Sequence, residues 1–236
     1  MAEIVCDDRP VSEINAEIRR LLADGHRDVT VRNPGARHNL AVALLQPCHV
    51  LFEGSVGYYC AGLIDGPTVE VKGSAGWGLG ESMLSGHVIV HGNAGNGAGA
   101  AMRGGKMIVC GDAAARAGVS MKGGLLLIAG NCGYMAGFMG QKGTLIVCGD
   151  AGEAFADSMY ETVCFVGGRI AELGNDAVVQ PPTPEDMAFL NETLQSCFPP
   201  SLRSRSPQPE KFTKVVAGRK LWNFDKRDWK IWQEAL

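Results

Sequence analysis

Histidine and serine are the residues of this sequence best suited to catalysis or metal binding, and their spacing brings few of them together. His87 and His91 share a face if they belong to one strand, but four extended residues separate them by about 13 Å, which is too far for one zinc ion. Ser82, Ser85 and Ser120 have no histidine and acid partners evident in the sequence, so no catalytic triad is predicted. We therefore assign no catalytic residue and no metal ligand.

Cysteine and glycine do not form a recognisable cofactor site either. The eight cysteines are scattered, without the close clustering of an iron–sulfur loop, and we expect reduced and buried thiols. The GxGxG stretches at 76–80 and 95–99 differ from a dinucleotide-binding loop, because no helix follows them to bind a pyrophosphate. No cofactor is therefore predicted on this chain.

Glycine recurs at a fixed interval, which predicts that the chain repeats one structural unit. One column has a step of 19 residues and comprises Gly54, Gly73, Gly92, Gly111, Gly130 and Gly149, with Gly167 following after 18. Three further columns, which begin at Gly57, Gly80 and Gly86, keep the same step. A period near twenty is typical of a stack in which each unit contacts mainly its neighbours.

Short apolar runs before the column glycines predict what is stacked. Runs such as 88–90 and 145–147 are rich in Val and Ile, and no amphipathic helix fits between the glycines. We therefore predict an all-β fold, a single-stranded, right-handed parallel β-helix of about seven coils of 19 residues. Glycine is expected at the corners, where the backbone turns with positive φ or passes close to the next coil.

Columns of similar residues are expected inside such a stack, because equivalent positions of successive coils pack in equivalent surroundings. Two candidate inward columns are Ile89, Ile108, Leu127 and Ile146, and Met83, Met102, Met121 and Met159, the latter with a gap at Gly140. Methionine sulfur could bind a soft metal, but filling an irregular core is its commoner role. A third column, Asn93, Asp112, Asn131 and Asp150, suits turns with local hydrogen bonds, and no calcium-binding nonapeptide pattern is present.

The flanks differ from the repeat, which gives three predicted regions. Residues 1–27 form an N-terminal helical cap, with a helix that begins at Ser12 and stops near Gly25. Residues 28–175 form the parallel β-helix. Residues 176–236 contain a C-terminal helix that starts at Thr183 and is expected to be a second cap, a Pro/Ser-rich linker and an aromatic tail.

The tail is the candidate partner interface from the sequence alone. Its aromatic residues are Trp222, Phe224, Trp229 and Trp232. From Pro200 onward nine Lys or Arg against four Asp or Glu give +5, so with −3 overall the remainder carries −8. Docking onto a partner and packing back onto the β-helix are equally weighted alternatives. Nucleic-acid binding is not expected, because the positive charge is local.

The sequence indicates where in the cell the protein is expected. The sequence has 46% hydrophobic residues but no run of about 20 apolar residues, and its start lacks the pattern of a secretory leader. We expect no membrane association and a soluble, cytoplasmic protein.

The GxGxG stretches, the 19-residue repeat and the upstream residues 31–33 and 38–40 resemble the GXGXG domain, the β-helical C-terminal domain of the large subunit of glutamate synthase. The resemblance covers about residues 28–175. In that family the large chain also carries a glutaminase domain with an N-terminal cysteine nucleophile and a flavin-binding synthase domain with an iron–sulfur cluster. Here Ala2 follows Met1, so that nucleophile is absent.

The resemblance implies a β-helix subunit of a split, multisubunit glutamate-synthase-like enzyme. N-methylglutamate synthase (methylamine–glutamate N-methyltransferase), a transferase of methylamine metabolism, is such an assembly. Its partners would be a glutaminase-like subunit and a synthase subunit holding FMN and an iron–sulfur cluster. Formylmethanofuran dehydrogenase also has a subunit with this domain and is the alternative, beside another glutamate-synthase-like amidotransferase.

The apolar character of both strand faces is a separate indication of a partner, because a solvated wall should alternate apolar and polar residues. Our first hypothesis is a non-catalytic scaffold that holds a glutaminase and a flavoenzyme in register. The second is an enzyme in its own right. Enzymes built on parallel β-helices display clustered Asp, Lys, Arg or His, whereas this repeat is mostly Gly, Ala, Val and Met.

Overall fold

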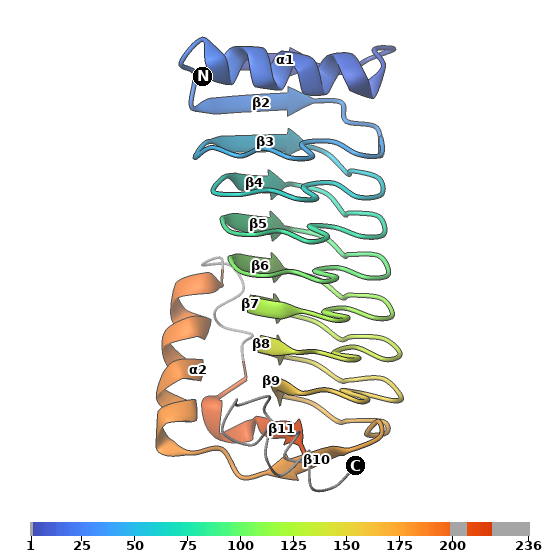
Figure 1. Ribbon diagram of the computed structural model, residues 1–236, viewed down its shortest axis with the longest axis vertical. Coiled ribbons are helices and arrows are strands. Elements are labelled where there is room, and N and C mark those ends of the chain that lie inside the picture. The colour runs from blue at the N-terminus through green and yellow to red at the C-terminus, as the bar shows by residue number, and fades with distance from the viewer. Residues whose placement is uncertain (1, 199–206, 219–236) are drawn as a thin grey trace, which may run out of the picture.

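The computed structural model describes residues 2–198 and 207–218, which wind into a tall stack of strands (Figure 1). One sheet of 11 strands has the order β1-β2-β3-β4-β5-β6-β7-β8-β9-β11-β10. The strands are β1 (Ala2–Val5), β2 (Asp28–Arg32), β3 (His49–Glu53), β4 (Thr68–Val71), β5 (His87–Val90), β6 (Lys106–Val109), β7 (Lys122–Ile128), β8 (Lys142–Val147), β9 (Glu161–Val166), β10 (Ala177–Gln180) and β11 (Thr213–Ala217). The helices are α1 (Val11–Ala23), α2 (Pro184–Cys197) and the short 3-10 helix η2 (Pro209–Lys211).

The predicted parallel β-helix is confirmed. Strands β1 to β9 pair in parallel. From β3 to β9 the 19-residue step sets the register, as where Val88 pairs with Met107. The stack makes about seven turns. Each turn contains one short named strand, since the glycines that close it leave no room for a longer element.

The side-chain columns of the strands are only partly those expected. In β5, Val88 and Val90 are fully buried in the interior, whereas Ile89 lies on the outer face and is only partly buried. The prediction that Ile89 and its equivalents Ile108, Leu127 and Ile146 point inward is therefore wrong. Because both faces of these strands are apolar, alternation gave no signal to distinguish inside from outside.

Helix α2 explains the apolar outer face. It stands beside β7 to β9 with its axis along the stack (Figure 1). Leu190 and Leu194 of α2 form one buried cluster with outer-face residues such as Ile146. The helix therefore covers the side of the stack, and the prediction that it caps the end is wrong. Since the chain's own helix covers this part of the outer face, the apolar residues there are not evidence of a partner protein.

The methionine column is confirmed as core. Met83, Met102, Met121 and Met159 are all buried. At the gap in the column, a Cβ on Gly140 would lie 2.6 Å from Oγ1 of Thr162, so the threonine side chain occupies part of the space that methionine fills in the other coils.

The wall opposite the strands has an unusual backbone, and we call it the αL wall. It consists of residues 39–43, 59–63, 78–82, 97–101, 116–120, 135–139 and 154–158, in each of which the first, third and fifth residues have positive φ. Successive coils of the wall are joined by backbone hydrogen bonds, for example from Leu63 N–H to the Glu81 carbonyl (2.9 Å) and from Gly80 N–H to the Cys60 carbonyl (2.8 Å). Where Arg116 and Met135 replace the middle glycine of GxGxG, the left-handed conformation is kept.

After Gly54, which has a φ of 146°, the first glycine column is required by close approach rather than by positive φ. A Cβ on Gly130 would collide with Oδ1 of Asp112, which accepts the N–H of Asn131 at 2.7 Å. The Asn and Asp column thus forms a ladder in which each side chain binds the backbone of the next coil. At the end of the column, Gly168 donates to the Gly149 carbonyl, so Gly168 rather than Gly167 is in register.

The ends of the stack are closed in different ways. Helix α1 lies across the N-terminal end, as predicted, and buries Ile14, Ile18 and Leu22. The sequence analysis missed β1, which precedes α1 and pairs with β2, because a single short strand outside the repeat carries no periodic signal. The other end is closed by the antiparallel strands β11 and β10. The predicted tail residues Trp222, Phe224, Trp229 and Trp232 lie outside the described residues.

Candidate functional site

Polar side chains of adjacent coils meet on the outer face of β3 to β5. The Glu70 carboxylate accepts from Lys72 Nζ and lies 3.3 Å from His49 Nε2 and 2.7 Å from His91 Nε2. Of the two histidines considered from the sequence, His91 belongs to this cluster, and His87 lies at the start of β5. The sequence analysis missed His49 and Glu70, which come together only because the coils stack in register.

The Glu70 carboxyl is ionised over an unusually wide pH range. Burial raises its pKa, but the hydrogen bonds from Lys72, His91 and His49 outweigh burial and lower the pKa to about 2. No group of three or more metal-ligating side chains is found among the residues that the structure describes. The cluster is a hydrogen-bonded network around the Glu70 carboxylate, in which Lys72 supplies the opposite charge.

Burial disfavours the thiolate form of several cysteines. Burial raises the pKa of Cys60, Cys132 and Cys148 to about 12 and that of Cys110 to about 11. All eight cysteines are free; five are buried, as expected, whereas Cys48, Cys110 and Cys197 are only partly buried. A protonated, buried thiol is a poor nucleophile and a poor metal ligand, so these residues serve packing.

Aromatic rings stack along one edge of the αL wall in the first coils. His38 and Tyr58 are stacked at 4.3 Å between ring centroids, and Tyr58 and Trp77 at 5.2 Å. Trp77 remains 51% exposed. A row of rings that presents its edges to solvent is a feature of surfaces that bind another molecule.

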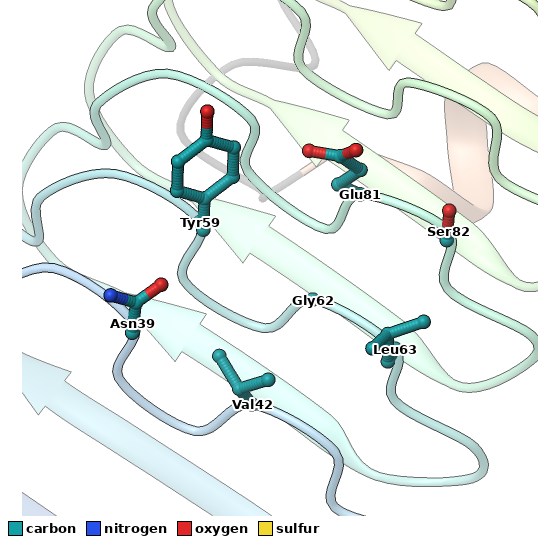
Figure 2. Close-up of a pocket in the computed structure, with 7 residues that line it drawn as sticks. All are labelled: Asn39, Val42, Tyr59, Gly62, Leu63, Glu81 and Ser82. Atoms are coloured by element: carbon teal, nitrogen blue, oxygen red, sulfur yellow. The ribbon is translucent and has the colours of Figure 1, made fainter. Parts of the chain in front are cut away.

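A depression of about 250 Å³ lies beside this row, on the αL wall of the first three coils. Its lining residues are Asn39, Val42, Tyr59, Gly62, Leu63, Glu81 and Ser82 (Figure 2). In Figure 2 the Tyr59 ring and the Glu81 carboxylate stand out from the wall on the same side, above the chain that carries Gly62. The site therefore combines an anion, a phenol, an amide and a hydroxyl with apolar side chains.

Two glycines shape the depression. A Cβ on Gly78 would lie 2.5 Å from Cδ1 of Tyr59 and 3.2 Å from Oε2 of Glu81, so these two side chains converge over the bare backbone of Gly78. A Cβ on Gly62 would meet nothing closer than 3.5 Å. The depression thus exists because position 62 has no side chain, although the space would accept one.

The sequence analysis missed this site because the depression results from a side chain that is absent at position 62. The position of Gly62 in the other coils is held by Val42, Glu81, Ala100, Val119, Phe138 and Asp157. To recognise the missing side chain one must know which column of residues faces solvent. The left-handed backbone of the wall determines that orientation, and it is not evident from the sequence.

In the part of the chain that the structure describes, no helix is long and apolar enough to cross a membrane.

Comparison with known proteins gives the family. No protein-family model matches the sequence. The chain is 53% identical over 218 residues to Protein GlxC of Rhizobium meliloti (strain 1021), and the match covers 92% of this chain and 93% of that protein. This chain belongs to the GlxC family. At this identity and coverage we expect the GlxC relative to share the solenoid, so the αL wall and the Glu70 cluster are the surfaces on which a GlxC family function can be sought.

Proposed function

We propose that this GlxC-family chain is a non-catalytic scaffold subunit of a cytoplasmic, glutamate-synthase-like enzyme. It joins a glutaminase-like subunit to a synthase subunit that holds FMN and an iron–sulfur cluster. N-methylglutamate synthase is the assembly that we favour. The proposal is supported by the glycine repeat that resembles the β-helical domain of glutamate synthase, together with the stacked coils that this repeat forms.

One observation carries the scaffold role, namely the exposed apolar side chains gathered on the first coils. Those exposed by 38% or more are Leu45 (68%), Tyr58 (38%), Tyr59 (47%), Leu63 (51%), Trp77 (51%) and Leu84 (42%). They belong to three successive coils of the αL wall and its edges, and three further exposed apolar side chains, Tyr134, Met139 and Tyr160, lie on or beside the wall in later coils. Apolar regions of this kind mark protein interaction sites on otherwise soluble folds.

The construction of the wall suits a scaffold. Its backbone groups bind the coils above and below, so the wall is held by a continuous ladder of hydrogen bonds. Sites built on such a rigid frame keep their spacing when partners bind. The Glu70 carboxylate, in contrast, is already engaged by Lys72, His49 and His91.

Co-expression of the full chain with the two proposed partner subunits tests the function. We expect a complex of fixed stoichiometry that survives size-exclusion chromatography with light scattering. A monodisperse monomer that ignores both subunits would contradict the proposal. Copurification with a molybdenum or tungsten protein instead would favour the formylmethanofuran dehydrogenase alternative.

A further inference from the structure

The geometry points to a specific role for the depression beside Tyr59. We infer that it anchors a lysine or arginine side chain of a partner protein, which makes the first three coils of the αL wall a docking surface. This inference rests on the proposed scaffold function and deepens it by naming the surface and the chemistry of the contact.

The shape of the depression fits a long side chain with a charged end. Val42 and Leu63 supply apolar sides for an aliphatic stem, and the Glu81 carboxylate and the Tyr59 ring supply the attraction for a cation. Within residues 2–198 and 207–218, the partly buried Glu81 side chain takes part in none of the ion pairs or hydrogen bonds found. A lysine or arginine from outside would give this carboxylate a partner.

The charge of the surrounding wall favours a basic partner. In the stretches 39–45, 59–65 and 78–84 the charged residues are Asp65 and Glu81, which gives −2. The equivalent stretches 97–103 and 116–122 carry Arg103, Arg116 and Lys122, which gives +3. The charge of the wall therefore varies along its length, because 135–141 has no charged residue and 154–160 carries Asp157, which gives −1. Arg19 of α1 donates to the Val42 carbonyl at the edge of the depression, so the attraction for a cation comes locally from Glu81 and Asp65.

The backbone at the rim of the depression carries strain. Tyr59 and Leu63 hold φ of 58° and 57°, a conformation that costs a residue with a Cβ roughly 1 kcal/mol. At the position of Tyr59 the next two coils have Gly78 and Gly97, so the fold does not need a tyrosine there. The left-handed backbone is shared by all seven coils of the wall, as at Arg116 and Met135, so the large exposed side chain of Tyr59, rather than its φ, distinguishes this coil.

The rim favours a protein rather than a free amine as the source of the cation. Tyr58, Trp77 and Leu84 are exposed around the depression, and a small amine would leave them in water. A protein would cover them while its basic side chain fills the pocket, which is the usual arrangement of an anchor within an apolar ring. The chain's own segment after Gly218 starts at the far end of the stack, where the Gly218 N–H binds the Asp176 carbonyl.

The test fills the depression without straining the fold. Gly62→Val introduces the side chain that Val42 and Val119 have at the same position, and its Cβ has ordinary van der Waals room. Ala100→Val is the matched control, since it enlarges the same column in a coil outside the depression. Glu81→Gln removes the charge and keeps the shape. Each full-length variant is titrated with the recombinant glutaminase-like subunit and, separately, with the flavin and iron–sulfur subunit.

We expect Gly62→Val and Glu81→Gln to weaken binding of one subunit by about tenfold or more, with unchanged thermal denaturation, and Ala100→Val to change it by less than about twofold. Unchanged binding in both pocket variants, or equal loss in the control, would overturn the docking site while the scaffold function stands. Wild-type protein that binds neither subunit would overturn both. Self-association that Gly62→Val abolishes would overturn the inference in favour of a second copy as the occupant.

Discussion

At the scale of single residues, the Glu70 carboxylate shows how stacking creates interactions that the sequence hides. It receives hydrogen bonds from side chains of its own coil and of both neighbours, and its side chain is only 20% exposed. The partners His49, Lys72 and His91 are exposed by about a third to a half, so solvent screens each pair. The cluster ties β3, β4 and β5 together on the part of the outer face nearer the N-terminal end.

Replacement of Glu70 tests this interpretation of the cluster. The folded-state pKa of about 2 lies below the ordinary value of 4.5, so the stabilisation is complete above pH 4.5 and is lost as the pH falls toward 2. We expect Glu70→Gln to lower the free energy of unfolding by about 1 kcal/mol at pH 7, after discounting for solvent screening. Urea denaturation at pH 7, 4.5 and 2.5 should show the gap between variant and wild type closing as the pH falls.

A control for this prediction is Glu53→Gln, which removes one half of the exposed pair with Arg32. It should cost less than about 0.5 kcal/mol at every pH. A Glu70→Gln gap that stays constant from pH 7 to 2.5 would mean that packing, and not charge, explains the loss.

At the scale of elements, the strands could be predicted and their surroundings could not. The strands follow from local signals, namely β-branched runs between glycines, repeated at one step. The face that α2 covers could not be predicted, since apolar residues such as Ile89 stand on both faces of the strands. Strands β1 and β11 lie outside the repeat and pair only through the tertiary fold. The depression was missed for a related reason, because Gly62 acts through the side chain that it lacks.

Helix α2 offers a prediction at this scale. Leu190 is fully buried between α2 and the outer face, so Leu190→Ala should destabilise this contact by about 3 kcal/mol. Because the inner core does not depend on α2, we expect the helix to loosen while the strands stay folded. Hydrogen exchange should rise in α2 and on β11, which the Lys214–Asp186 ion pair joins to the start of the helix at 2.6 Å.

The matched control is Glu192→Ala on the exposed side of the same helix, which should change stability by less than about 0.5 kcal/mol. If Leu190→Ala instead unfolded the strands together with α2, the helix would have to be regarded as part of one cooperative unit with the β-helix.

At the scale of the whole molecule, the solenoid is a linear array in which each coil contacts mainly the coils before and after it. Helix α1 closes one end and the β11–β10 pair closes the other. In such an array stability is close to a sum of coil and interface terms, and unfolding starts where a coil has lost its neighbour. Damage to one cap should therefore spread along the stack from that end.

Ile18→Ala tests this linear behaviour. Ile18 of α1 is fully buried against the first coils, so its truncation should cost about 3 kcal/mol. We expect amide exchange to accelerate most in β1 to β3, less in β5, and least in β8 and β9, because each intact interface resists the spread of unfolding. The exposed α1 variant Glu13→Ala is the control and should leave the exchange profile of the strands unchanged. An increase of the same size in every strand would show that the stack unfolds as a single unit, and the N-terminal docking surface could then not loosen without the rest of the solenoid.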